Sequence, residues 1–285
     1  MTSTISGKTL VAGVVGTPVC HSLSPTIHNA WIAAAGIDAV YVAFAPTVDG
    51  FARFAEGLRG GAARGLNVTA PFKQDALALA DRASDRARRA GAANLLIFET
   101  GGTIWADNTD GEGLLAALVE QAPEFDPAAG PAVVLGAGGA ARGAAAALLD
   151  AGAPSIRIVN RSVARGEFLA HSLGDRVEVF SVEAAGRALT GVAAVINATP
   201  AAWNAVEGSA LSLDEAPAAA VVMDMVYRPL DTAFLREARA RGLRTVDGMA
   251  MLIGQARPSF AALFGRPPPD LDIRAVALAA LEKLG

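Results

Sequence analysis

Short polar side chains gather in three segments around one lysine and one aspartate. The segments are HSLSP (21–25), GLNVTAPFK (65–73) and DNTDG (107–111), and they contribute Lys73 and Asp110. Hydroxyl and amide groups suit a polyhydroxylated small ligand, because each buried donor or acceptor needs a partner and rejects analogues that lack one. A lysine can transfer the proton of an alcohol as hydride leaves its carbon, and a neighbouring carboxylate can orient that lysine. The sequence therefore favours an acid–base pair, with an ordinary salt bridge as the alternative.

Further polar residues stand at the ends of predicted elements. Ser22 and Ser24 precede a predicted helix, so capping of that helix is the alternative to ligand binding. Lys73 is one of only 3 lysines, against 21 arginines, so its presence among these groups needs a reason. Amide and hydroxyl groups also lie at the ends of predicted strands, on Asn67, Thr69 and Asn94.

The segment VVLGAGGAA (133–141) fits the pattern G-x-G-x-x-A between an apolar run and a helical one. In that pattern Gly136 allows a tight turn, Gly138 lets the backbone approach a pyrophosphate, and Ala141 permits close packing of helix on strand. Backbone N–H groups at the start of the helix would hold the anion. Glycine-rich turns are common in this chain, but the strand–turn–helix context favours a dinucleotide site.

The next predicted strand discriminates between two dinucleotides. A site for NAD usually has an acidic residue there, which accepts a hydrogen bond from the ribose 2′-hydroxyl. Here the strand ends in Asn160, Arg161 and Ser162, and Arg165 follows one turn later. Arginine suits bidentate contacts to a phosphate, so these residues favour NADP, with ordinary surface arginines as the alternative.

Composition bounds the class of protein. The chain has 285 residues, of which 52% are hydrophobic and 18% charged, so it can bury a sizeable core and its length predicts two domains. A net charge of -4 argues against nucleic acid or an anionic membrane as the main partner. The apolar excess lies in 64 alanines, and no run of bulky apolar residues predicts a membrane helix.

The single cysteine, Cys20, cannot form an internal disulfide, and we interpret it as a small core residue. No group of cysteines and histidines indicates a metal site. The N-terminal residues lack a signal-peptide pattern, so we expect a cytoplasmic protein.

Predicted strands and helices alternate along the chain, regularly so from residue 111. This order predicts an α/β protein with an N-terminal substrate domain followed by a Rossmann-type, doubly wound dinucleotide-binding domain. We expect these domains over 1–109 and 110–247, with helices over 248–285 packing back on the first. The expected strands are 10–15, 39–44, 65–68, 94–99, 103–106, 132–135, 156–160, 177–180, 194–197 and 221–224. The expected helices are 24–36, 48–59, 72–80, 82–90, 113–121, 140–151, 163–173, 231–241, 249–264 and 273–284.

Eight ordered segments resemble the motifs of the shikimate dehydrogenase family and span almost the whole chain. They are GTPVCHSLSPTIHN (16–29), GLNVTAPFK (65–73), DNTDGEG (107–113), GAGGAARGA (136–144), NRS (160–162), NATP (197–200), DMVYRP (224–229) and DGMAMLIGQARPSF (247–260). An ordered set is far more specific than any single motif. The resemblance implies NADP-dependent, reversible reduction of 3-dehydroshikimate to shikimate in aromatic amino-acid biosynthesis.

The resemblance also implies a role for each matching residue. Lys73 would be the general acid and base, assisted by Asp110. The substrate would contact Ser22 and Ser24 through its carboxylate, and Thr69, Asn94, Asp110 and Gln255 through its hydroxyl side, with Tyr227 closing the site and Asn67 as a further contact. The pyrophosphate would lie on Gly136, Ala137, Gly138, Gly139 and Ala140, the adenosine phosphate on Asn160, Arg161, Ser162 and Arg165, and the nicotinamide against Thr199, Met225 and Gly248, with Asp85 as a further cofactor contact.

Two positions depart from the family pattern. Leu95 stands where the family has threonine, and Trp203 stands where it has methionine. A lost hydroxyl or an altered wall shifts discrimination among related substrates, so a quinate or amino-shikimate dehydrogenase is the alternative activity. A non-catalytic NADP-binding regulator is the alternative from another class, although Lys73 and Asp110 are intact. We expect a monomer or a homodimer with a small-molecule substrate and no nucleic-acid or membrane partner.

Overall fold

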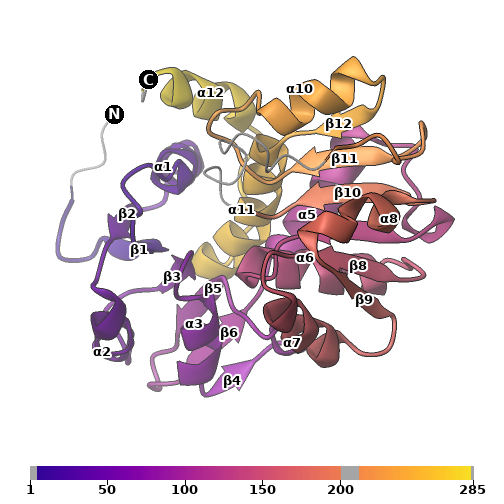
Figure 1. Cartoon of the computed structure of the whole chain (residues 1–285). Coiled ribbons are helices and arrows are strands. Elements are labelled where there is room, and N and C mark those ends of the chain that lie inside the picture. Colours follow the sequence, from indigo (N-terminus) through magenta and orange to yellow (C-terminus); the bar gives the residue numbers. More distant parts are fainter. Residues whose placement is uncertain (1–4, 200–211, 284–285) are drawn as a thin grey trace. The chain divides into compact units, whose positions relative to one another are not determined.

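Two compact units make up the chain in the computed structural model, which describes residues 5–199 and 212–283. The first unit comprises Met1–Thr109 and Gln255–Gly285, and the second comprises Asp110–Gly254 (Figure 1). Residues 248–254, which the sequence analysis placed with the first domain, group with the second unit in this division. Trp203 lies outside the described residues.

The first unit is built on a mixed sheet with the strand order β2-β1-β3-β5-β6-β4. Strand β1 pairs in parallel with β2 and β3, whereas β5 pairs antiparallel with both β3 and β6. The hairpin expected around residues 94–106 is therefore confirmed. The strands are β1 (Leu10–Val15), β2 (Ala39–Phe44), β3 (Gly65–Val68), β4 (Arg82–Ala83), β5 (Leu95–Phe98) and β6 (Ile104–Asp107).

Helices of the first unit cover this sheet. Phe51, Phe72, Leu66 and Leu96 are among the buried residues of its core. Helix α1 packs against α12, so the C-terminal helix returns to the first unit as expected. The helices are α1 (Ser24–Ala35), α2 (Phe51–Glu56), α3 (Lys73–Leu79), α4 (Asp85–Ala90), the second part of α11 (Gly248–Phe264), and α12 (Ile273–Lys283).

Three local expectations for the first unit are wrong. The helix expected over 82–90 is a short strand, β4, followed by α4, because the Ser84 hydroxyl accepts a hydrogen bond from the Ala87 amide at 3.1 Å and so begins the helix only after Ser84. The helix expected over 48–59 is a 3-10 turn followed by α2, which ends at Glu56 before Gly57. Cys20 is exposed rather than buried.

The second unit is a parallel sheet with the strand order β12-β11-β10-β7-β8-β9. The sequence missed its short edge strand β12, whose three residues carry no readable alternation. The strands are β7 (Ala132–Leu135), β8 (Ile156–Val159), β9 (Val177–Phe180), β10 (Ala194–Asn197), β11 (Val221–Asp224) and β12 (Arg244–Val246).

Both faces of this parallel sheet are covered, because successive strand residues point to opposite sides. Val134 and its equivalents pack with residues of α5, α6, α7 and the start of α11, whereas Val133 and Leu135 pack with residues of α8 and α10. The expected doubly wound architecture is thus confirmed. The helices of this unit are α5 (Asp110–Gln121), α6 (Gly139–Asp150), α7 (Val163–Leu173), α8 (Ala185–Leu189), α10 (Ala233–Ala240) and the first part of α11. In the described part of the chain, no helix combines the length and apolar character needed to cross a bilayer.

A histidine of α1 is buried among aromatic side chains of the first unit. His28 is fully buried and stacks on Tyr41 with ring centroids 4.1 Å apart, and neither ring nitrogen has a hydrogen-bond partner among the described residues. Burial lowers the pKa of His28 from 6.5 to about 3, because the cationic form loses its hydration.

This depressed pKa predicts a specific acid sensitivity. Between pH 6.5 and about 3 the unfolded chain binds a proton at His28 that the folded chain does not, so stability is lost as pH falls below 6.5. The free energy of unfolding should fall by roughly 1.4 kcal/mol per pH unit from this group alone. Urea unfolding of His28→Phe at several pH values should show a flatter slope than the wild type, whereas His171→Gln, at an exposed histidine, should keep the wild-type slope. An unchanged slope in His28→Phe would refute the assignment.

Candidate functional site

The loops that follow β1 and β3 in the first unit lie directly against each other. The amide of Thr17 donates to the carbonyl of Ala70 at 3.1 Å, and the amide of Thr69 donates to the carbonyl of Val15 at 2.9 Å. A Cβ on Gly16 would stand only 2.3 Å from a methyl carbon of Thr69, so the close approach requires glycine there. The loop that carries Ser22 and the loop that carries Thr69 are thereby fixed together.

Two of the predicted ligand hydroxyls are uncommitted. Ser24 is the first residue of α1 and not its cap: Leu23 holds the capping position, and the Ser24 amide donates to the Ser22 hydroxyl at 3.3 Å. Capping, the alternative role of Ser24, is therefore wrong. Within the described part of the chain, no hydrogen bond engages the hydroxyl groups of Ser24 and Thr69, which leaves both available to a ligand.

Lys73 begins α3, immediately after the loop that contains Thr69. Its carbonyl accepts a hydrogen bond from the amide of Ala93 at 2.8 Å. The side chain of Lys73 is partly exposed, and the next residue after Ala93 is the buried Asn94. The backbone therefore brings the predicted acid–base lysine to the segment that holds a predicted amide ligand.

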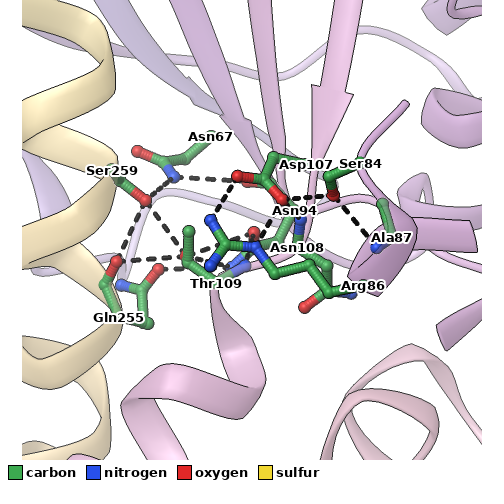
Figure 2. A network of polar contacts seen from close by, with 10 residues as sticks. All are labelled: Asn67, Ser84, Arg86, Ala87, Asn94, Asp107, Asn108, Thr109, Gln255 and Ser259. Carbon is green, nitrogen blue, oxygen red and sulfur yellow. Dashed lines mark hydrogen bonds and ion pairs between the residues drawn. The ribbon is translucent and has the colours of Figure 1, made fainter. Parts of the chain in front are cut away.

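Asn94 is the centre of a buried polar network (Figure 2). Its Oδ1 accepts from the amide of Thr109 at 2.8 Å, and its Nδ2 donates to the hydroxyl of Thr109 at 3.0 Å. The same Nδ2 lies 3.4 Å from Oε1 of Gln255 on α11. The structure thus joins two predicted substrate residues, Asn94 and Gln255, through hydrogen bonds that fix their amide groups.

Asn67 belongs to the same network and faces inward. Its Oδ1 accepts from the Tyr41 hydroxyl at 2.8 Å, and its Nδ2 donates to the Ser259 hydroxyl at 2.9 Å and to the Asn94 carbonyl at 3.2 Å. Both ends of its amide group are therefore engaged within the protein, which favours a supporting role for Asn67 over direct substrate contact.

Sequence reasoning missed other members of this network. The Ser259 hydroxyl lies 3.1 Å from that of Thr109 and donates to the Gln255 carbonyl at 3.0 Å (Figure 2). Asp107 is 2% exposed, accepts from the amide of Asn108, and forms an ion pair with Arg86. The available signal was the spacing of four residues between Gln255 and Ser259, which places both on one helix face.

Leu95 is fully buried in β5, where it pairs with Asn67 and Asp107 in the neighbouring strands. Residues directly opposite each other in an antiparallel pair share a face, so Leu95 lies on the same face of the sheet as Asn67 and Asp107. With no exposed surface, its side chain offers nothing to a ligand in solution. Its effect on substrate choice is therefore limited to packing.

The remaining predicted substrate residues belong to the second unit. Asp110 is the first residue of α5 and is 5% exposed, and Tyr227 follows β11 and is partly exposed. Asp85, predicted as a cofactor contact, begins α4 of the first unit, where its exposed carboxylate lies 3.6 Å from Arg88.

The glycine-rich loop of the second unit has the geometry that a pyrophosphate needs. Gly136 has a φ of +107°, and a Cβ there would stand 3.3 Å from a methyl carbon of Thr199, so both backbone and packing require glycine. Gly138 caps α6 with ordinary extended backbone, and a Cβ there would meet no atom of the described residues within 4 Å. The protein's own packing does not require Gly138, whereas an anion seated on the start of α6 would. Ala137, Gly139 and Ala140 complete this loop, and all three are partly exposed.

The loop after β8 offers uncompensated positive charge. Ser162 caps α7, accepting from the amide of Arg165 at 3.4 Å, and Asn160 donates to the Ser162 carbonyl at 2.7 Å. Arg161 and Arg165 are exposed, and neither forms an ion pair with any residue that the structure describes. An anion with the geometry of a phosphate is the natural partner of two such guanidinium groups. The residues present therefore fit NADP.

The three residues predicted at the nicotinamide surround the ends of β10 and β11. Thr199 follows β10 and Met225 follows β11, and both are partly exposed. Gly248 is buried, and a Cβ there would stand 2.5 Å from the Met225 carbonyl oxygen. The backbone of Gly248 therefore packs closely against the backbone of Met225.

The fold and the site residues define a dinucleotide-dependent oxidoreductase. Its other unit is rich in polar side chains suited to binding a small ligand. Residues 14–96 match the family model of the shikimate dehydrogenase substrate binding domain, and residues 120–232 match that of shikimate / quinate 5-dehydrogenase. The chain belongs to the shikimate dehydrogenase family.

Relatives resemble the chain over nearly its whole length. A shikimate dehydrogenase (NADP(+)) of Caulobacter vibrioides is 56% identical over 282 residues, covering 99% of both chains. The shikimate 5-dehydrogenase of Thermus thermophilus, solved in complex with NADP(H) and shikimate, has a TM-score of 0.83 and 35% identity, covering 95% of this chain and 99% of that one. A quinate dehydrogenase of Corynebacterium glutamicum, solved with NAD, has a TM-score of 0.85 and 27% identity, covering 96% and 99%.

Removal of the Ser259 hydroxyl should destabilise the first unit. Ser259→Ala deprives the buried Asn67 amide and the Thr109 hydroxyl of a shared partner, which should lower the free energy of unfolding by about 1–3 kcal/mol. The exposed Ser6→Ala serves as the control, with an expected change below about 0.5 kcal/mol. Urea unfolding followed by circular dichroism measures both. Equal stability of the two variants would show that the network does not depend on this hydroxyl.

Proposed function

We propose that the chain catalyses the reversible, NADP-dependent reduction of 3-dehydroshikimate to shikimate, as an enzyme of aromatic amino-acid biosynthesis. This proposal rests on the presence of both units in one chain of the family. One unit holds Lys73 beside a buried amide network, and the other holds a glycine-rich loop followed by two arginines that form no ion pair with any described residue. The high identity with NADP-dependent shikimate dehydrogenases supports the same activity and argues against a non-catalytic regulator.

Lys73 and Asp110 are proposed as the acid–base pair. Bound NADPH supplies the hydride that reduces the carbonyl carbon of the substrate. The Lys73 ammonium donates a proton to the carbonyl oxygen as it becomes a hydroxyl, and the carboxylate of Asp110 orients that hydroxyl. In the reverse direction neutral Lys73 accepts the hydroxyl proton.

The other predicted residues are proposed to bind substrate and cofactor. Ser22 and Ser24 take the substrate carboxylate, with the uncommitted Ser24 hydroxyl as support. The hydroxyl side is held by Thr69, Asn94 and Gln255, with Tyr227 closing the site. The pyrophosphate lies on the loop 136–140, the 2′-phosphate on Arg161 and Arg165, and the nicotinamide against Thr199, Met225 and Gly248. We propose a substrate domain of residues 1–109 and 248–285 and an NADP domain of residues 110–247, in a cytoplasmic monomer or homodimer.

Turnover assays test the activity and the role of Lys73. Absorbance at the nicotinamide band, with NADP or NAD paired with shikimate or quinate, should show fast turnover for NADP with shikimate. Lys73→Ala should lower kcat by about 10²–10⁴-fold, because the proton has no positioned donor, while NADP affinity stays unchanged. Wild-type kcat in Lys73→Ala would remove this lysine from the mechanism. Faster turnover with quinate or an amino-shikimate would establish the alternative substrate.

Charge removal at the adenosine end should change the choice of cofactor. Arg161→Ala and Arg165→Ala each lose a charge-assisted hydrogen bond, worth roughly 1.5–3 kcal/mol, so the Kd for NADP should rise by about tenfold or more while that for NAD changes little. Arg187→Ala, at an exposed arginine in α8 of the same unit, is the matched control and should bind both as the wild type does. Fluorescence titration gives each Kd. A parallel loss of NAD affinity would mean that these arginines do not read the 2′-phosphate.

A further inference from the structure

A buried carboxylate lies beneath the two loops that follow β10 and β11. Asp224, the last residue of β11, is fully buried. Its Oδ1 accepts from Nδ2 of Asn197 and from the amide of Val226, both at 3.0 Å, and its Oδ2 accepts from the Thr232 hydroxyl at 2.8 Å. These three donors come from the end of β10, from the loop after β11, and from the residue that caps α10.

The same hydrogen bonds continue into the loop after β10. Oδ1 of Asn197 accepts from both the amide and the hydroxyl of Thr199, at 3.1 and 2.5 Å. An unbroken chain of hydrogen bonds therefore joins Thr199 to Val226 through Asn197 and Asp224. Its two ends are the segments that the proposed function places against the nicotinamide.

Packing holds these segments from the outer side. A Cβ on Gly248 would stand within 2.6 Å of the carbonyl carbons of Met225 and Val226, and a Cβ on Gly136 would stand 3.3 Å from Thr199. Each loop therefore packs against a glycine and also forms hydrogen bonds with Asp224 or Asn197. A displacement of either loop would break a buried hydrogen bond or clash with backbone.

Burial of a carboxylate such as that of Asp224 costs desolvation free energy. Burial raises the pKa of Asp224, and hydrogen bonds from Val226, Thr232 and Asn197 lower it. A well-packed apolar side chain of similar volume would stabilise the fold more. The distinctive contribution of the carboxylate is to accept three donors in fixed directions and so to fix two loops at once.

Building on the proposed function, we propose that Asp224, with Asn197 and Thr232, is a positioning residue for hydride transfer: it holds Thr199 and the segment 225–227 in the arrangement that orients the nicotinamide. In the proposed function the adenosine half of NADP lies on the loops after β7 and β8, whereas the donors Asn197, Val226 and Thr232 belong to other segments. The two halves of the cofactor should therefore respond differently to substitutions at Asp224.

The test separates the two halves of the cofactor. In Asp224→Ala, kcat with shikimate should fall by at least about tenfold, and the Kd for NADPH should rise, because misplaced reacting atoms slow transfer steeply. The Kd for adenosine 2′,5′-bisphosphate, which lacks the nicotinamide, should stay within about twofold of the wild type, because it depends on the loops that carry the phosphate contacts. A primary deuterium isotope effect larger than that of the wild type would show that hydride transfer itself is slowed.

Two control variants separate position from charge and from folding. Asp224→Asn retains an acceptor for Val226 and Asn197 and presents an amide to the Thr232 hydroxyl, which can accept, so it should recover kcat to within about threefold of the wild type. If Asp224→Ala does not fold, Thr232→Val removes one donor and Thr232→Ser keeps it, and only the valine variant should lose kcat. Wild-type kcat in a folded Asp224→Ala or Thr232→Val variant, equal weakening of both ligands, or an Asp224→Asn as impaired as Asp224→Ala would overturn the proposal.

Failure of the proposed function gives a different result. A wild-type protein that binds NADPH but does not oxidise shikimate refutes the substrate assignment. The ratio of the two Kd values in Asp224→Ala still reports on the nicotinamide end in that case. A ratio equal to that of the wild type would refute the positioning role independently of any turnover.

Discussion

Hydrogen bonding of buried polar side chains is the constraint on which both units depend. Asn94 in the first unit and Asp224 in the second are almost completely buried, and a buried amide or carboxylate without partners costs about 1–3 kcal/mol or more. Each therefore forms hydrogen bonds with residues of other segments: Thr109 and Gln255 in one case, Asn197 and Thr232 in the other. The loops that carry ligand-binding groups are fixed by the same bonds that satisfy the buried ones.

Parallel pairing determines which loops can share such a network. The carboxyl ends of β1 and β3 lie side by side because these strands pair in parallel, and this brings the loop of Ser22 to the loop of Thr69. In the second unit β7 pairs with both β8 and β10, so the glycine-rich loop, the arginine loop and Thr199 emerge at one edge of the sheet. Ligands of open parallel sheets bind beyond this edge. The two units thus use one rule of sheet geometry for different ligands.

The sequence was sufficient where a pattern is local. Apolar runs bounded by glycine, proline or asparagine predicted nearly all long strands, and the strand–turn–helix motif predicted the loop at Gly136. Local patterns could not predict β12, whose three residues become a strand only through pairing with β11. They also could not predict Ser259 or the role of Asp224, because Asn67 lies 192 positions from Ser259 and Asn197 lies 27 positions from Asp224. For His28, burial in the aromatic cluster overrode the ordinary tendency of a histidine to form hydrogen bonds.

Glycines separate the demands of the fold from those of the ligand. Gly16, Gly136 and Gly248 stand where a Cβ would press on another loop, so the protein's own packing accounts for them. Gly138 differs, because its backbone is ordinary and a Cβ at this start of α6 would contact none of the described residues. Folding alone would permit alanine there, with less loss of chain entropy. Close approach of an anion is the reason for glycine in the proposed function, which also places the 2′-phosphate on Arg161 and Arg165 of the next loop.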